Sequence, residues 1–469
     1  MRNKDGLSPG DIHALSMLDA TAQKALVTNK SVHNETLFFC AQEKISAFNP
    51  AFNAVTHTDF SLAEAALNNS SGDTVLLPYL LKGSDEYSGF PMQCGSRLRK
   101  DATGTAIHPF MEALTANGVL PVGMTAMPEF GLLASGESLL YGPSKNPWLT
   151  SHSALGSSTG AAIAVATGMT PYAHASDAAG SIRMPASACG VVGFKPSAGF
   201  NLRARRFDMI DDYLCTDSLL ARSVRDVIDA TNFTRPPSLQ KVTLTTEPVH
   251  VGVIRQGLGN VEASSAVGIA LEEHIALLRS MPGVTVETCA APYDLDALQK
   301  ALQTLWCYLG GGIVDGVAAQ GFTTSDVLEP WPHYLHQRRA SLSDTALREA
   351  FHAITVAKLQ LEEFHRKVDI VLSPVVADLP PPLGFLAPDI DGETLWNRLF
   401  AFMAFTPIQN LLGAPSITLP VYQHQSGLPV GMLLSAAPAQ DDRLLSFASQ
   451  VEACAPAYAK WQPQGHQGE

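Results

Sequence analysis

The chain has 469 residues, 46% of them hydrophobic, with a mean hydropathy of +0.08 and a formal net charge of −13. This composition is sufficient for a large buried core, and the acidic charge argues against a nucleic acid or an anionic membrane as a partner. The N-terminal segment lacks a secretory apolar run, no segment reaches the ~18 apolar residues that span a bilayer, and the cysteines form no CxxC pair. We therefore expect a cytoplasmic protein with free thiols.

The first part of the chain is predicted to alternate between helices and strands. Residues 9–70 are mainly helical in composition, with a turn and a short strand in NPAFNAVTHTDF. Residues 73–83, DTVLLPYLLKG, form an apolar run typical of a buried strand, and Lys82 stands at its end. HPFMEALTANGVLPVGMT then predicts a helix, a stop at Gly118 and another strand, which indicates α/β layers.

The rest of the chain continues this alternation. Residues 158–168, STGAAIAVATG, predict a helix of mostly small residues that packs closely against its neighbours, followed by a strand in GVVGFKPSAG. A polar connector at 235–250 precedes a strand in VHVGVIR, and residues 258–365 are predicted to be mainly helical. DIVLSPVV, SITLPVY and GLPVGMLLSA are further strand candidates.

Three polar features stand among apolar or small residues. Lys82 either extends to solvent or lies in a desolvated slot, where a neutral amine can act as a general base. GSSTG opens the small-residue helix, but it lacks the GxxxxGK[ST] spacing of a phosphate loop. Ser181 follows small residues whose backbone N–H groups can converge on one oxyanion. The GxSxG nucleophile motif is absent, and neither His152 nor His174 has an acidic partner at a telling spacing.

In their order along the chain, these features resemble the amidase signature family of serine hydrolases. LGSSTGAAIAVATGMTPYAHASDAAGSIRMPASACGVVGFKPS is similar to the family pattern GGSSGG, a small-residue helix and DxGGSIRxPAxxCGxxGxKPT. The resemblance implies an α/β fold with a large mixed central β-sheet covered by helices on both faces. It also implies one amidase domain over 1–469, with a catalytic core at 60–235, a variable helical substrate-side region at 258–365 and a C-terminal part of the sheet at 366–469.

The resemblance further implies a Ser–cis-Ser–Lys triad. Ser181 would be the nucleophile, and Ser157, preceded by a cis peptide bond, would link it to the general base Lys82. The oxyanion hole would comprise the backbone N–H groups of Ala178, Ala179, Gly180 and Ser181. Supporting roles would fall to Ser158, Asp177 and Arg183, for which loop hydrogen bonding is favoured over substrate contact. No cofactor and no metal site are expected.

The sequence departs from the family pattern around these residues. Leu155 and Thr159 replace glycines on either side of GSS, and Ala178 and Ala179 stand where a residue plus glycine is usual. A methyl group in place of a glycine hydrogen is strained where φ is positive, but it leaves the N–H group in place. We therefore expect an altered pocket shape and not a loss of activity.

The substrate is expected to be a neutral, hydrophobic amide, anilide or carbamate, because the candidate lining is apolar and offers no obvious arginine. The candidate lining residues are Met127, Phe130, Gly131, Leu132, Leu133, Tyr141, Trp148, Trp306, Leu309, Trp331, Trp396, Phe400 and Ile408. Ordinary core packing is the alternative for each aromatic residue. LLKGSDEYSGFPMQCGSRL also resembles bacterial relatives that act on nylon-type amides, and carbamate-cleaving relatives share the scaffold. A monomer or homodimer is expected. An amidotransferase subunit and a catalytically silent relative stay open as alternatives.

Overall fold

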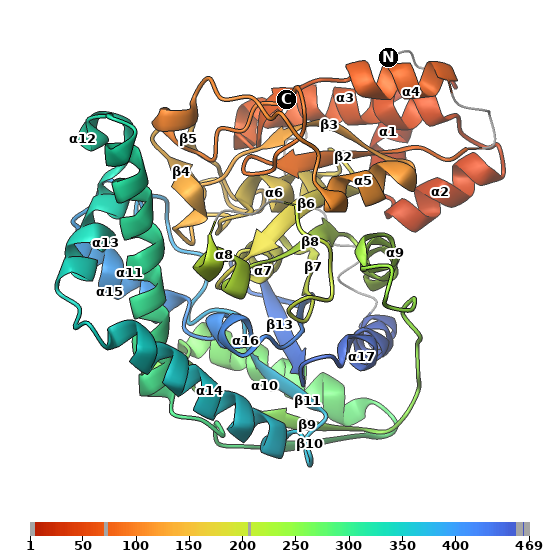
Figure 1. Cartoon of the computed structure of the whole chain (residues 1–469). Coiled ribbons are helices and arrows are strands. Elements are labelled where there is room, and N and C mark those ends of the chain that lie inside the picture. The colour runs from red at the N-terminus through yellow and green to blue at the C-terminus, as the bar shows by residue number, and fades with distance from the viewer. Residues whose placement is uncertain (1–4, 70–73, 205–207, 456–462, 464–469) are drawn as a thin grey trace.

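An 11-stranded β-sheet runs through the centre of the computed structural model, which describes residues 5–69, 74–204, 208–455 and 463 (Figure 1). The strand order is β1-β3-β2-β6-β8-β7-β12-β13-β11-β9-β10, and a separate hairpin pairs β4 with β5. The strands are β1 (Val55–Thr58), β2 (Leu77–Lys82), β3 (Val119–Thr125), β4 (Glu137–Ser138), β5 (Gly142–Pro143), β6 (Tyr172–Asp177), β7 (Val192–Lys195), β8 (Thr216–Ala221), β9 (Val249–Val253), β10 (Val284–Thr288), β11 (Ile370–Pro374), β12 (Ser416–Gln423) and β13 (Pro429–Ala436).

The sheet is mixed. β2 pairs in parallel with β3 and β6, and β9 pairs in parallel with β10 and β11. The strands between these two parallel groups are antiparallel, and β12 and β13 form a hairpin. Because β2 and β6 are parallel, their carboxyl ends meet at the same edge of the sheet. This edge carries Lys82 and Asp177.

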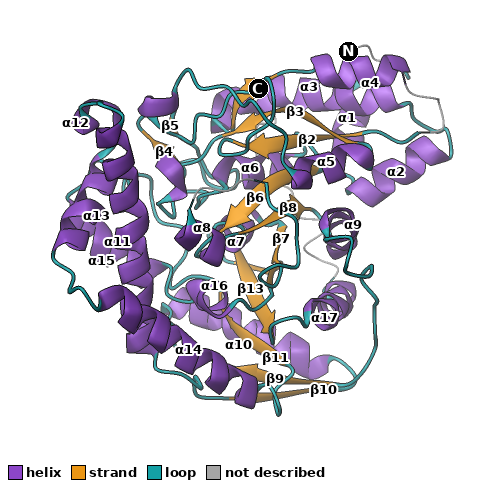
Figure 2. Cartoon of the chain, in the orientation of Figure 1, coloured by secondary structure: helices purple, strands orange, loops and turns teal. Residues whose placement is uncertain are grey.

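Helices cover both faces of the sheet (Figure 2). The helices are α1 (Pro9–Ser16), α2 (Ala20–Thr28), α3 (Asn34–Phe52), α4 (Ser61–Asn69), α5 (Pro109–Ala116), α6 (Thr159–Thr167), α7 (Arg183–Cys189), α8 (Met209–Leu214), α9 (Val224–Thr234), α10 (Ser265–Ser280), α11 (Leu295–Ala319), α12 (Thr324–Val327), α13 (Pro330–Ala340), α14 (Ala346–Phe364), α15 (Gly392–Phe402), α16 (Pro407–Leu412) and α17 (Asp441–Cys454).

Alternation along the strands divides the interior into separate cores. Leu77, Tyr79 and Leu81 of β2 pack on one face with α1, α5, α9, α10 and α17, and we call this cluster the first core. Leu80 packs on the other face with α3, α6 and α7, in the second core. A third core lies among α11, α13, α14, α15 and α16. Because successive side chains alternate, Lys82 points to the face that Leu80 shares with α6.

Helix α6 approaches the sheet closely because its residues are small. All nine of its residues are buried. A Cβ atom added at Gly160 would lie 2.1 Å from the carbonyl oxygen of Ala54, so a larger residue there would force the backbones apart. The predicted close packing of this helix is therefore confirmed, and it places the N-terminus of α6 beside the end of β2.

The sequence predicted most, but not all, of these elements. The predicted strands that became β1, β2, β3, β7, β9, β11, β12 and β13 are present, and so is the mainly helical region. Five strands were missed, namely β4, β5, β6, β8 and β10. Helix α3 continues through Asn49 and Pro50 to Phe52, so the turn predicted in NPAFNAV comes later than expected. It falls at Asn53, which has a left-handed φ of 53°. The predicted helical region 9–70 ends, and the predicted strand 73–83 begins, at a residue outside the described ranges. Both ends of the predicted domain 1–469 also lie outside them. Within the described ranges, no helix is long and apolar enough to cross a bilayer.

Candidate active site

Lys82 lies buried at the edge of the sheet, with only 1% of its surface exposed. Its Nζ donates to the Oγ of Ser157 at 2.9 Å and to the Oγ of Ser176 at 2.9 Å, with the carbonyl oxygen of Ser176 at 3.4 Å. The structure therefore brings together two residues that the sequence separates widely. It also adds Ser176, at the end of β6, which sequence reasoning missed.

Ser157 stands immediately before α6, and the peptide bond between Gly156 and Ser157 is cis. The next residue, Ser158, holds this segment against its neighbours, since its N–H donates to the carbonyl oxygen of Ser181 and its Oγ donates to that of Ser176. Leu155, which replaces a family glycine, is fully buried and has a φ of 58°. This departure therefore places a leucine where the backbone has a left-handed φ.

The N–H groups of the loop from Asp177 to Ser181 differ in whether they have an acceptor. Asp177 accepts the N–H groups of Gly180 at 2.7 Å and of Ile182 at 3.0 Å. Among the described residues, no acceptor binds the N–H groups of Ala178, Ala179 and Ser181. The Gly180 N–H is therefore occupied, whereas its three neighbours can bind a negatively charged oxygen.

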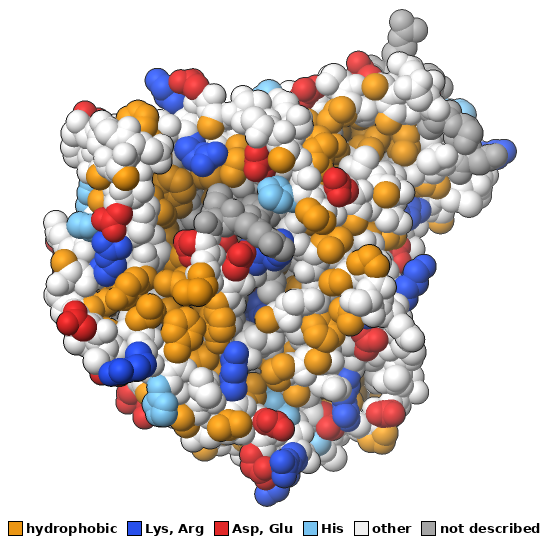
Figure 3. All heavy atoms as spheres, viewed as in Figure 1, with side chains coloured by type: hydrophobic (Ala, Val, Ile, Leu, Met, Phe, Trp, Pro, Cys, Tyr) orange, Lys and Arg blue, Asp and Glu red, His pale blue; other side chains and the backbone are white. Residues whose placement is uncertain are grey.

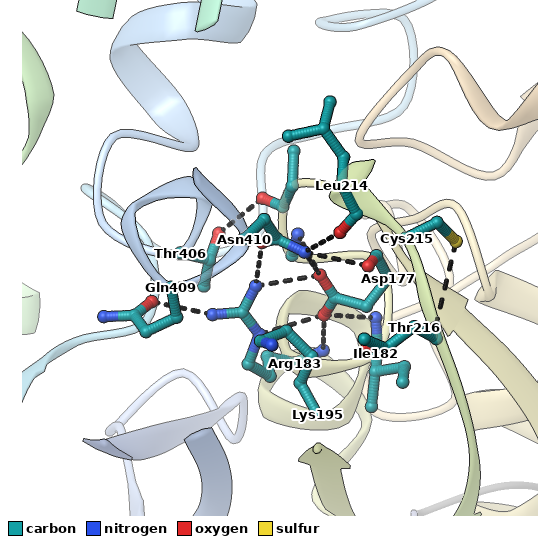
Figure 4. Close-up of polar contacts among 12 residues, drawn as sticks. Asp177, Ile182, Arg183, Lys195, Leu214, Cys215, Thr216, Thr406, Gln409 and Asn410 are labelled. Carbon is teal, nitrogen blue, oxygen red and sulfur yellow. Dashed lines mark hydrogen bonds and ion pairs between the residues drawn. The ribbon is translucent and has the colours of Figure 1, made fainter. Parts of the chain in front are cut away.

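A buried polar cluster joins this loop to α16 (Figure 4). Arg183 contacts both carboxylate oxygens of Asp177, at 2.8 and 2.9 Å, and both side chains are fully buried. Arg183 also donates to the side-chain oxygens of Gln409 and Asn410, and Asn410 donates back to the backbone of Asp177. Burial alone would raise the pKa of Asp177, but Arg183 outweighs it and holds the pKa well below its usual range. Neither Asp177 nor Arg183 lines the cavity described next.

A cavity of about 360 Å³ opens at this edge of the sheet, and Ser157, Ser176 and Ser181 all lie in its wall. The remaining lining residues are Arg99, Phe130, Gly131, Leu132, Ala178, Asp208, Asp211, Cys215, Trp306, Leu309, Gly312 and Ile313. Figure 3 shows the face of the molecule seen in Figure 1, on which charged and apolar side chains are interspersed. Five of the predicted substrate-side residues, Phe130, Gly131, Leu132, Trp306 and Leu309, are therefore in the wall.

The other predicted substrate-side residues lie elsewhere. Met127, Leu133, Trp331, Trp396, Phe400 and Ile408 are buried in the protein interior. Tyr141 donates to the side chain of Gln93, and Trp148 donates to the carbonyl oxygen of Cys189. Trp306 and Trp331 both donate their indole N–H to the carbonyl oxygen of Leu132, each at 3.2 Å. Core packing thus accounts for most of the predicted aromatic residues. Trp331 contacts the wall residue Leu132 from the protein interior.

Charged residues in the wall correct the expectation of a purely apolar lining. Arg99 contributes to the cavity, although its guanidinium donates to the carbonyl oxygen of Met92. Asp208 and Asp211, at the start of α8, also contribute. Both aspartates lie far from the other site residues in the sequence, and no motif there indicated that they line the cavity.

Sequence reasoning also missed Thr406, in the C-terminal part, and Lys195, at the end of β7, which both lie close to this loop. Thr406 donates its hydroxyl to the carbonyl oxygen of Ala179 at 2.8 Å. Lys195, fully buried near Asp177 and Arg183, donates to the carbonyl oxygen of Pro196, and burial lowers its pKa to about 7. The hydrogen-bonding residues of TPIQNLL, in and just before α16, are the signal that could have indicated packing on a polar loop.

A mixed sheet with Lys82, Ser157 and Ser181 brought to one edge is what the resemblance to the amidase signature family implied. A family model described as Amidase matches residues 37–445. The chain is 30% identical to a putative amidase AmiC of Mycobacterium bovis over 461 residues, covering 94% of this chain and 96% of the relative. It is 30% identical, over the same shares, to a 6-aminohexanoate-cyclic-dimer hydrolase of a Pseudomonas species. A solved structure of 6-aminohexanoate cyclic dimer hydrolase complexed with substrate superimposes with a TM-score of 0.85 at 26% identity, covering 96% of this chain and 99% of that one.

The chain belongs to the amidase family, and it is an amide-hydrolysing enzyme. The family and the fold predicted from the sequence are both confirmed.

Proposed function

We propose that this enzyme hydrolyses the C–N bond of a neutral, largely apolar amide, anilide or carbamate through an acyl-enzyme on Ser181. The observation that carries the proposal is the 2.9 Å contact between Lys82 Nζ and Ser157 Oγ, with Ser157 and Ser181 in the wall of one cavity. Such a contact gives a lysine amine a route for moving a proton.

In the proposed first step, Ser181 Oγ attacks the carbonyl carbon of the substrate. Its proton passes to Ser157, whose own hydroxyl proton passes to the neutral amine of Lys82. The C–N bond then breaks, and the same route returns a proton to the leaving nitrogen, because an amine leaves poorly without one. Water attacks the resulting ester by the same proton route, releases the acid and restores Ser181.

The tetrahedral intermediate carries a negative oxygen that needs hydrogen-bond donors. The N–H groups of Ala178, Ala179 and Ser181 supply them in this proposal, since the Gly180 N–H already donates to Asp177. Preorganised donors of this kind stabilise developing charge more than water does, because they need no reorientation. The proposed oxyanion hole thus has three N–H donors, whereas the resemblance implied four.

The shape and chemistry of the wall support the proposed substrate. Phe130, Leu132, Trp306, Leu309 and Ile313 offer apolar surface to the acyl or amine side chain. Arg99, Asp208 and Asp211 leave room for a polar group at the periphery of such a substrate. The similarity to a 6-aminohexanoate-cyclic-dimer hydrolase supports a non-peptide aliphatic amide among the candidates.

A substrate panel tests the proposal. We expect the wild-type enzyme to hydrolyse members of a series of p-nitroanilides, primary amides and aryl carbamates of graded acyl length, and we expect Ser181→Ala to hydrolyse none of them. Ser187→Ala is the matched control, since Ser187 is a buried serine of α7 that accepts the N–H of Gly431 outside the cavity wall. Equal activity in Ser181→Ala and the control would overturn the proposal. Turnover that requires glutamine and a second subunit would favour an amidotransferase.

A further inference from the structure

A row of buried ionisable side chains lies directly behind Lys82. The carboxylate of Asp85 accepts the backbone N–H of Lys82 at 2.7 Å and lies 2.6 Å from Nδ1 of His174. Nε2 of His174 lies 3.2 Å from a carboxylate oxygen of Asp217. All three side chains are fully buried. We call Asp85, His174 and Asp217 the buried ion row.

The row lies on the side of the sheet that faces the first core. The ring of His174 packs edge-on against Phe110 of the first core, at 5.0 Å between centroids. Tyr172 and Leu219 belong to the same core, and alternation places His174 and Asp217 on their side of β6 and β8. The row therefore lies behind the active-site edge and lines no part of the cavity.

The row connects the strands that carry the proposed reacting groups. Asp85 follows β2 and holds the peptide N–H of Lys82, whereas His174 precedes Ser176, the second acceptor of Lys82, by two residues on β6. Asp217 of β8 is paired in register with Ser176. A displacement in the row would thus move Lys82 and its acceptor relative to one another.

Charge balance specifies the protonation state of the row. Each ring nitrogen of His174 faces a carboxylate oxygen, so both nitrogens must carry a proton if neither contact is to be repulsive. Burial alone would lower the pKa of His174, but Asp85 and Asp217 together raise it above its ordinary value. Arg203 lies 3.0 Å from Asp217 and supplies a second positive charge.

We propose that Asp85 and His174 are positioning residues, which fix the backbone of Lys82 through a buried carboxylate–imidazolium–carboxylate row and so aim its amine at Ser157. This inference rests on the proposed catalytic role of Lys82. The imidazolium keeps the Asp85 carboxylate in place, because an unpaired buried carboxylate would turn towards another donor. Without that charge the N–H of Lys82 loses its charged acceptor, and the end of β2 is held less firmly.

The test compares the rate at which a fluorophosphonate labels Ser181 in the full-length wild-type enzyme and in Asp85→Asn and His174→Gln, across a range of pH. We expect each variant to lower the rate about tenfold to a hundredfold and to displace its pH profile, because small misplacements of a reacting group are costly. The double variant should be no slower than the slower single variant, since both changes break one row. Kinetics with an amide substrate should show the loss in kcat and not in KM.

His274→Gln is the matched control. His274 is also a buried histidine, but it lies on α10, and burial lowers its pKa to about 3. We expect this variant to lose stability while its labelling rate and pH profile stay those of the wild type. Folded His174→Gln and Asp85→Asn enzymes with wild-type rates at every pH would overturn the positioning role.

A second measurement applies even if the variants fail to fold. Nitrogen-15 NMR of the wild-type histidine rings should show both nitrogens of His174 protonated at neutral pH and His274 neutral. A neutral His174 would overturn the inference. If the wild-type enzyme is not labelled at all, the proposed function fails and the positioning role fails with it. If labelling is normal in the wild type and unchanged in the variants, the positioning role alone is wrong.

Discussion

At the scale of single residues, Gly180 is the position where the loop from Asp177 to Ser181 requires glycine. Its φ is +127°, and a Cβ atom added there would lie 2.2 Å from the hydroxyl oxygen of Thr406. Ala178 and Ala179, by contrast, have no positive φ. The two alanines that depart from the family pattern therefore fit the loop without backbone strain, and the constraint falls on the next residue.

This contrast gives a matched pair of substitutions. We expect Gly180→Ala to lower kcat by roughly a hundredfold or more, because it would displace N–H donors that stabilise the oxyanion. Ala179→Gly should change kcat by no more than a few fold, since it keeps the N–H group and needs no new conformation. Steady-state kinetics on one p-nitroanilide check both. Equal losses in the two variants would contradict this description of the loop.

Lys82 provides a second test at this scale. We expect Lys82→Ala to lower kcat by about 10² to 10⁴ at neutral pH, the range typical of a lost general base. Lys82→Met should behave in the same way although it fills the slot, which separates the loss of the amine from the effect of a cavity. The pH dependence of kcat should flatten in both variants. Retention of most activity at neutral pH by the methionine variant would refute the proton-relay role.

Some residues of the site could be predicted from the sequence and others could not. Lys82, Ser157 and Ser181 stand in ordered motifs, so the resemblance indicated them before their contact was seen. His174 gave no such signal, because its carboxylate partners come from the turn after β2 and from β8. Sequence spacing reveals partners within one helix or strand, whereas contacts across a sheet depend on strand order and register.

At the scale of elements, the cavity wall is joined to α13 through a pair of buried carboxyl groups. Glu129, in the short 3₁₀ turn before Leu132, accepts the backbone N–H of Glu329, the residue that precedes α13. Glu329 in turn accepts the N–H of Leu139. Burial raises the pKa of Glu129 to about 7 and that of Glu329 to about 8, and the Glu129 carboxyl adds to the rise at Glu329.

The sign of this shift yields a pH-dependent stability prediction. Between about pH 4.5 and pH 8 the folded state keeps a proton on Glu329 that the unfolded chain has released, so this group's contribution to stability falls as pH rises. Glu329→Gln removes the titration and keeps an acceptor for Leu139. We expect the variant to gain about 4 kcal/mol relative to wild type on going from pH 5 to pH 9.

Urea unfolding at the two pH values measures this difference. Glu362→Gln, at an exposed position of α14, is the control and should show no pH-dependent change relative to wild type. A Glu329→Gln variant whose difference from wild type is the same at both pH values would show that the carboxyl is already ionised in the folded protein.

The longer strands that the sequence missed have two physical causes. β6 and β8 carry buried polar residues such as Asp177 and Asp217 among their apolar ones, which conceals an apolar run. β10 is a short edge strand with no fully buried residue. Trp331 and Trp396 were predicted to line the substrate cavity but are buried in the interior, because composition does not show which way a side chain on a helix points.

At the scale of the whole molecule, the sheet includes strands from β1, at Val55, to β13, which ends at Ala436. β7 of the predicted catalytic core pairs with β12 of the C-terminal part, so the two parts share one sheet. Asn410 of α16, in the C-terminal part, also donates to the carbonyl oxygen of Asp177, at the start of the loop from Asp177 to Ser181. We propose on this basis that the chain forms one amidase domain.

One domain predicts one cooperative unfolding event. We expect differential scanning calorimetry to show a single transition, and we expect the loss of fluorophosphonate labelling to coincide with it. Two separated transitions, with labelling lost in only one, would show that the catalytic core and the C-terminal part unfold independently.

The central claim is that Ser181 is the nucleophile. Peptide mapping by mass spectrometry after treatment with a fluorophosphonate tests it most directly, because the adduct marks the serine that attacked. We predict one adduct on Ser181 in the wild-type enzyme, none in Ser181→Ala, and strongly slowed labelling of Ser181 in Lys82→Met. An adduct on another serine, or an unlabelled wild-type enzyme that still hydrolyses amides, would contradict the account.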